Sequence, residues 1–169
     1  MKIFFDTEFY TRENKIDLIS IRLVRDDGAM LYLENGGFNW SEVPDDDWLQ
    51  TNVVPHLAKA NDLVSTEVLR RRLINFTRDI KPEFWAYYAS YDWAALCMLF
   101  GGMLNLPANW PKYVMDVKQY QQTIDPDLTL PKAYQIEHHA LQDAMWTKKA
   151  FHAVRERAVE MRAAGAWDL

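Results

Sequence analysis

Alternating hydrophobic and polar positions near the start of the chain predict β-strands. Residues 16–25 show this pattern, with β-branched side chains at near-alternate positions, and the apolar, aromatic run over residues 2–6 predicts a further strand. Residues 26–28 are typical of a tight turn, and residues 29–33 supply a return strand. The start of the chain therefore predicts an antiparallel meander.

Helical spacing of apolar residues appears in the middle of the chain. A short helix is expected between Asp45 and Leu57. Ser65 or Thr66 can cap a second helix that runs to about Arg78. Two helices are thus expected before the next strand.

Strands and helices alternate in the second half. A buried strand is predicted over residues 84–89, followed by a helix with Ser90 as its N-cap that ends at residues 101–102. A fifth strand is expected over residues 113–117, and a long helix over residues 140–161. This order predicts an α/β fold with a mixed sheet and helices on its faces.

Length and composition indicate one folded unit. The 169 residues, 49% of them hydrophobic, match a single domain over residues 1–169. With 24 acidic and 19 basic side chains, the formal net charge is -5, so no global positive field attracts a polyanion. Any contact with nucleic acid must be local or assisted by metal.

Nothing in the sequence predicts export or membrane insertion. The apolar start is interrupted by acids, which is unlike a signal peptide, and no run approaches the length of a membrane span. Cys97 is the only cysteine and cannot form an intramolecular disulfide. A cytoplasmic protein without membrane contact is expected.

Two acids stand where a charge is costly to bury. Asp6 and Glu8 follow the first apolar strand, and residues two apart on a strand point to the same side. A divalent cation would compensate both charges. A solvated strand end is the alternative explanation.

Two further acids and a histidine occur in similar surroundings. Asp92 and Asp143 are each expected in the first turn of a helix, where the helix dipole alone also favours an acid. His138 precedes Asp143 by five residues and could act as a general base. Asp116, which ends the predicted fifth strand, is interpreted as a cap or turn residue.

The segments around these residues resemble the three exonuclease motifs of the DEDDh (DnaQ-like) 3'-5' exonucleases. The matching segments are, in chain order, Asp6-Thr7-Glu8, Ala89-Ser90-Tyr91-Asp92 and His138-His139-Ala140-Leu141-Gln142-Asp143. The resemblance extends from Lys2 to about Val159. Within the family, the chain is most similar to the small 3'-5' exoribonucleases of actinobacteria and their phages.

The resemblance implies a fold, an activity and a set of partners. The fold is a ribonuclease-H-like mixed sheet, with an antiparallel meander followed by parallel strands. The activity is two-metal hydrolysis of RNA, single-stranded or with a 3' overhang, that releases nucleoside 5'-monophosphates; single-stranded DNA is a further possible substrate. A homodimer is also implied.

The resemblance assigns roles to individual residues as well. Two divalent cations, Mg2+ or Mn2+, would be held by four carboxylates, and His138 would be the catalytic base. The carboxylates that it assigns both to metal binding and to catalysis are Asp6, Glu8, Asp92 and Asp143.

Expected substrate contacts lie beside these motifs. Thr7, Phe9 and Tyr88 are the candidates, and the aromatic rings could stack on the last bases. Tyr88 stands where many relatives carry Asn, which puts any contact made by that Asn in doubt.

Two other functions remain open from the sequence. A DNA-trimming 3'-5' exonuclease would use the same chemistry. A non-catalytic nucleic-acid-binding domain of the same fold is the second alternative, although such a domain has no physical need for four acids and a histidine.

Overall fold

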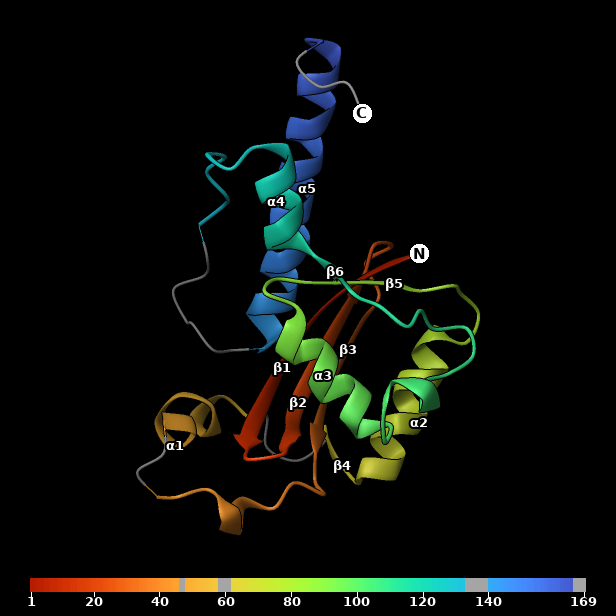
Figure 1. The fold of residues 1–169 in the computed structure, drawn as a ribbon. Coiled ribbons are helices and arrows are strands. Elements are labelled where there is room, and N and C mark those ends of the chain that lie inside the picture. Colours follow the sequence, from red (N-terminus) through yellow and green to blue (C-terminus); the bar gives the residue numbers. More distant parts are fainter. Residues whose placement is uncertain (46–47, 58–61, 133–139, 166–169) are drawn as a thin grey trace.

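A computed structural model describes residues 1–45, 48–57, 62–132 and 140–165, with the backbone alone at 140–142. Six strands are found in these residues: β1 Lys2–Arg12, β2 Lys15–Arg25, β3 Met30–Asn35, β4 Leu63–Val64, β5 Glu83–Ala86 and β6 Met115–Asp116. They form one sheet in the order β4-β3-β2-β1-β5-β6 (Figure 1). The pairs β1/β2 and β2/β3 are antiparallel, and β3/β4, β1/β5 and β5/β6 are parallel. The predicted mixed α/β sheet of ribonuclease-H-like type is confirmed.

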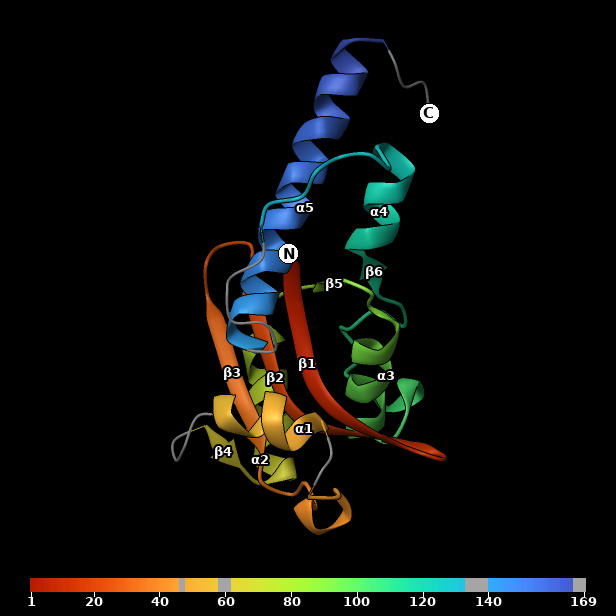
Figure 2. The same ribbon diagram turned by 90° about the vertical axis from the view of Figure 1, so that its left-hand side faces the viewer.

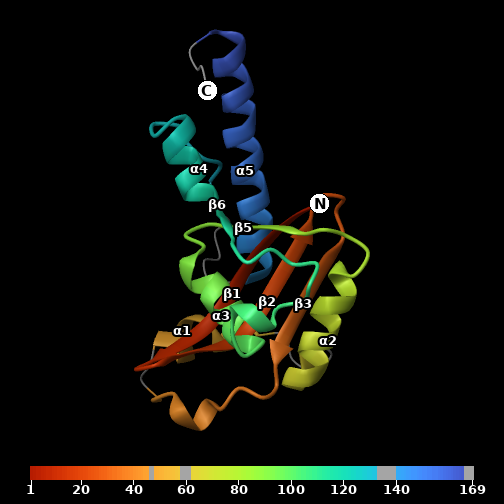
Figure 3. The same cartoon turned by 45° about the vertical axis from the view of Figure 1, so that its right-hand side comes forward.

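Helices cover both faces of this sheet. The described helices are α1 Trp48–Asn52, α2 Thr66–Thr77, α3 Ser90–Leu99, α4 Val117–Ile124 and α5 Ala140–Ala163. Helices α1 and α5 lie on one face (Figure 2), and α2 and α3 lie on the other (Figure 3). The C-terminal part of α5 extends past the sheet with α4 beside it (Figure 1). None of the helices described combines the length and apolarity needed to cross a bilayer.

Strand β1 is the centre of the core because it is buried on both faces. Phe5 is fully buried towards α2 and α3, where it meets Phe84 edge to face. Phe4, one residue earlier, is fully buried on the α5 side against Phe151. Burying one such side chain contributes about 1.5–3 kcal/mol. Alternation along this strand also decides which later side chains face which helix.

Strand β1 is longer than its apolar pattern predicts. Pairing with β2 continues to Arg12 opposite Lys15, and a β-bulge shifts the register between Glu8 and Phe9. Strand β5 pairs with β1 over Lys2–Phe4 and no further along β1. The edge of β1 that follows Phe4 is therefore not paired with β5, and both acids of the first motif lie along this stretch.

The chain leaves β5 earlier than predicted. The strand ends at Ala86, and Tyr88 adopts a left-handed backbone with φ of 57°. This conformation costs a residue with a Cβ roughly 1–2 kcal/mol. Helix α3 then begins at Ser90, so the expected Ser90 cap is wrong by one residue: the N-cap is Ala89, which has no side-chain bond to the helix.

The predicted end of α3 and start of α2 are confirmed. Gly101 has φ of +78°, and the amides of Gly101 and Gly102 donate to the carbonyls of Met98 and Cys97, which is the Schellman arrangement. Ser65 is the N-cap of α2 and accepts from the amide of Val68.

Two predictions concern shorter elements. The helix expected between Asp45 and Leu57 is reduced to α1 and a 3-10 turn over Val54–His56, where Pro55 prevents a regular helix. The fifth strand is only the two residues of β6. Strand β4 and helix α4 were not predicted, because each is short or has a mostly polar sequence.

Asp116 connects β6 to the start of α3. One carboxylate oxygen caps α4 by accepting from the amide of Gln119 at 3.1 Å, and the other accepts from the amide of Ala89 at 2.8 Å. The interpretation of Asp116 as a cap is confirmed. The bond from Ala89 to Asp116 fixes the turn between β5 and α3.

We predict that Asp116→Ala lowers the free energy of unfolding by about 1–2 kcal/mol, because both amides lose their acceptor. Chemical denaturation measures the change. Asp79→Ala is the matched control, since the Asp79 side chain is 86% exposed and pairs with neighbouring Arg78. Equal effects of the two substitutions would contradict the capping role.

Candidate functional site

Strand β1 and helix α5 bring three acids together. Asp6 and Glu8 lie two residues apart on β1 and point to the α5 face, and Asp143 lies in the first turn of α5. One carboxylate oxygen from each lies within 4.8 Å of the others. Residues separated by more than 130 positions in sequence thus form one cluster of negative charge.

Asp92 reaches this region from the opposite face of the sheet. It lies in the first turn of α3 and is only 7% exposed. Its Oδ1 accepts two hydrogen bonds from Thr7, one from the backbone amide at 2.9 Å and one from Oγ1 at 2.7 Å. Thr7 lies between Asp6 and Glu8, so these bonds tie the fourth acid directly to the strand that carries the other two.

The pKa values of the acids show the cost of this arrangement. Burial raises the pKa of Asp6 well above its ordinary value, and the three neighbouring carboxylates raise it further. Burial, with the charges of Asp143 and Asp92, raises the pKa of Glu8 to about 8. Burial also raises the pKa of Asp92 to about 6, although the hydrogen bonds from Thr7 oppose the shift. The cluster therefore favours protons or a cation.

The donor set fits a divalent cation. Within the described chain, no Lys, Arg or His pairs with Asp6, Glu8 or Asp92. Converging carboxylate oxygens are the ligands that Mg2+ and Mn2+ prefer. A cation would stabilise the ionised acids that are otherwise forced together.

The three residues predicted to contact substrate have different surroundings in the structure. Phe9 stacks on Tyr91 with ring centroids 5.7 Å apart and an angle of 8° between the planes. Tyr88 is 65% exposed and meets Tyr87, which in turn meets Trp146 of α5. Thr7 is 5% exposed. Tyr88 thus presents an exposed ring and Phe9 a ring stacked on Tyr91. Thr7 is buried and donates hydrogen bonds to Asp92.

The predicted general base, His138, lies outside the described residues. Lys112, Lys118 and Lys148 each donate to an oxygen within the fold, and Lys148 bonds the carbonyls of Arg25 and Asp26. Sequence reasoning missed the Thr7–Asp92 connection, because no local pattern signals a bond across 85 positions.

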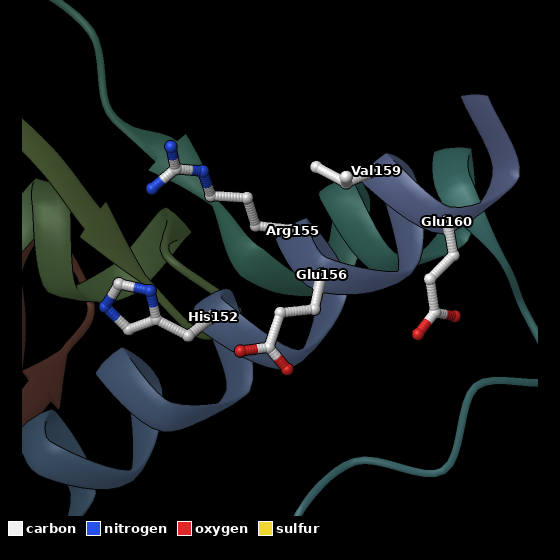
Figure 4. Close-up of a pocket in the computed structure, with 5 residues that line it drawn as sticks. All are labelled: His152, Arg155, Glu156, Val159 and Glu160. Carbon is white, nitrogen blue, oxygen red and sulfur yellow. The ribbon is translucent and has the colours of Figure 1, made fainter. Parts of the chain in front are cut away.

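A separate hollow lies on the flank of α5 and is not part of this cluster. Its lining side chains project from the C-terminal half of the helix (Figure 4). They are His152, Arg155, Glu156, Val159 and Glu160. The nearest of them follows Asp143 by nine residues, roughly 13 Å along the helix.

Comparisons with known proteins find relatives over nearly the whole chain. No model of a known protein family matches the chain. Two proteins named 3'-5' exoribonuclease, from the CDC 1551 and H37Rv strains of Mycobacterium tuberculosis, are each 30% identical to it over 159 residues, covering 91% of this chain and 93% of theirs.

A solved structure supports the fold alone. The Pan2 catalytic unit of Neurospora crassa, which comprises a protease and a nuclease domain, superposes with a TM-score of 0.51 and 14% identity. The match covers 98% of this chain but only 28% of that one.

We predict that, without divalent cations, the chain becomes less stable as pH rises from about 4.5 to about 8. The folded chain keeps the Glu8 proton up to a pKa of about 8, whereas the unfolded chain loses it near the ordinary value of 4.5. Between these values the unfolded state binds fewer protons, so stability falls with rising pH. Denaturant midpoints in EDTA measure the trend.

Glu8→Gln is the control, because the amide does not titrate and should flatten the pH dependence. Mg2+ or Mn2+ should raise the melting temperature more at about pH 8 than at about pH 5, since protons compete with the cation at low pH. A wild-type midpoint that follows the Glu8→Gln midpoint at every pH would contradict this account of the cluster.

Proposed function

We propose a function on the premise that the chain belongs to the family of the mycobacterial 3'-5' exoribonucleases and, more broadly, to the DEDD-type exonucleases. The chain is accordingly an enzyme, a 3'-5' exonuclease that hydrolyses phosphodiester bonds. The finer proposal is that residues 1–169 act on RNA, single-stranded or with a 3' overhang, and release nucleoside 5'-monophosphates. The convergence of Asp6, Glu8 and Asp143 within 4.8 Å is the observation that carries the hydrolytic chemistry. The relatives named 3'-5' exoribonuclease support RNA as the substrate.

In this proposal the four acids hold two divalent cations, Mg2+ or Mn2+. Such cations, when bound, neutralise the phosphodiester charge, lower the pKa of water and stabilise the leaving oxygen. The chain's own contribution is to hold the carboxylates close together before substrate arrives. Thr7 does this for Asp92 with two hydrogen bonds, and the docking of α5 on β1 does it for Asp143.

His138 is proposed as the general base that takes the proton from the attacking water. This role rests on its place in the third motif, two residues before α5 begins and five before Asp143. Imidazole as a class has a pKa near neutral pH, which suits a side chain that takes up and releases protons at that pH.

Aromatic residues at the rim are proposed to hold the 3' end. The ring of Tyr88 is largely exposed, and Phe9 and Tyr91 present a stacked pair next to Thr7. Stacking of a base on such a ring contributes about 1–3 kcal/mol and is tolerant of sequence. The homodimer implied by the family resemblance stays a prediction.

We predict that the chain shortens 5'-labelled single-stranded RNA from its 3' end with Mg2+ or Mn2+ and that EDTA abolishes the reaction. Asp6→Asn should lower the rate by about a thousandfold or more, because a metal ligand supplies several kcal/mol of transition-state stabilisation. Gel electrophoresis of the products measures this. Asp127→Asn, at an exposed acid away from the cluster, should retain the wild-type rate.

The same gel distinguishes the alternatives. Single-stranded DNA of equal sequence shortened faster than RNA would indicate a DNA-trimming exonuclease. Intact RNA and DNA under every condition would indicate a binding domain without turnover.

His138→Ala should lower kcat by about a hundredfold to ten-thousandfold, the range for loss of a general base. Its affinity for Mn2+, measured by calorimetry, should stay near the wild-type value. The adjacent His139→Ala serves as the control. A comparable loss of metal affinity in His138→Ala would refute the assignment as base.

A further inference from the structure

A polar hollow with a volume of about 200 Å³ lies where the β1–β2 hairpin approaches α2 and the end of α3. Its lining includes Ile16, Leu18, Asn35, Thr66, Arg70 and Met98. The hollow is several times larger than the volume of about 30 Å³ that one water molecule occupies in the liquid. It therefore has room for a small group such as a phosphate. None of these residues belongs to the carboxylate cluster.

Arg70, which lines the hollow together with Lys15, makes it attractive to an anion. Its Nε donates to the carbonyl of Leu99 at 2.5 Å, at the C-terminal end of α3 where the helix dipole favours a cation. In the part of the chain that the structure describes, neither Nη atom has a hydrogen-bond or ion-pair partner. The guanidinium is therefore held in place while its two terminal nitrogens stay available.

The other polar groups of the hollow add donors and little repulsion. The amide of Ile16 donates to the sulfur of Met98 at 3.2 Å, which is a weak acceptor. Among the described residues of the lining, Asp17 is the one acid, and it is already paired with Lys15 and Arg12. Burial raises the pKa of Asp17, but the hydrogen bonds from Lys15 and Arg12 outweigh this and hold it below its ordinary value.

The hollow lies on the same face of the sheet as Thr7 and Asp92. Along β1, Phe9 pairs with Leu18 and Thr11 pairs with Ile16, so the hollow begins within about 13 Å of Thr7 at 3.3 Å per residue.

Helix α3 runs from the stacked pair of Phe9 and Tyr91 to the hollow. Tyr91, which stacks on Phe9, and Met98, which lines the hollow, are seven residues apart and thus on one side of the helix. Stacked rings followed by a basic group form the pattern by which proteins hold a single strand.

We propose that this hollow binds a backbone phosphate of RNA a few nucleotides upstream of the 3' end, with Arg70 as its main ligand. The inference rests on the proposed function, since it extends the same substrate path. RNA would run from the carboxylate cluster past the edge of β1 that β5 leaves unpaired, and then across Phe9 and Tyr91 to Arg70. Longer RNA then gains a contact that a dinucleotide cannot make.

The test compares a dinucleotide with RNA of about ten nucleotides, within the span that such surfaces cover. For Arg70→Ala, the ratio of kcat/KM on the long RNA to that on the dinucleotide should fall several-fold. The slope of log KM against log salt for the long RNA should decrease by about 0.7, the value for one phosphate contact on a single strand. Arg70→Lys should recover part of both effects.

Arg71→Ala is the matched control, because it removes the same charge from an exposed position of α2 outside the hollow. The same ratio and slope in Arg70→Ala and Arg71→Ala, with both variants folded by melting temperature, would overturn the subsite. Inhibition by free inorganic phosphate that depends on Arg70 and affects both substrates equally would also overturn it, by indicating a site for free anion. Wild-type protein that hydrolyses neither substrate would instead refute the proposed function.

Discussion

Electrostatic repulsion among the carboxylates is the constraint around which this molecule is organised. Burial and, after it, neighbouring carboxylates raise the pKa of both Asp6 and Glu8, and a flexible chain would relieve this by moving the acids apart and into water. Here the acids are fixed to elements that cannot move independently. Strand β1 is buried on both faces by Phe4 and Phe5, so the strand that carries two of the acids is among the most firmly packed parts of the sheet.

The connections between layers have the same effect. Thr7 joins β1 to α3 through both its amide and its hydroxyl, and Asp116 joins β6 to the turn before α3. Tyr88 lies in that turn with an unfavourable left-handed backbone, which the bond from Ala89 to Asp116 helps to maintain. Packing and hydrogen bonds elsewhere thus offset the energetic cost of the site.

What the sequence could predict depended on whether the signal was local. Asp6, Glu8 and Asp143 could be placed because an apolar strand and an uninterrupted helix each leave a clear periodic pattern. Three other features could not be predicted, because each depends on segments that meet only in the folded chain. They are the bond between Thr7 and Asp92, the left-handed backbone of Tyr88 and the hollow at Arg70. Helix α4 was missed for a related reason: its register is set by the Asp116 cap and by packing on α5, not by its own apolar content.

The order in which the acids occur along the chain bears on the protein's synthesis. Asp6 and Glu8 leave the ribosome first, Asp92 follows, and Asp143 is delivered by the last described helix. A nascent chain can pair β1 with β2 and dock α3 before α5 exists, yet its carboxylate cluster then lacks a member. An enzyme that degrades nucleic acid is therefore incomplete while it is still held on the ribosome that translates its messenger RNA, and the cluster is completed only when α5 packs on β1.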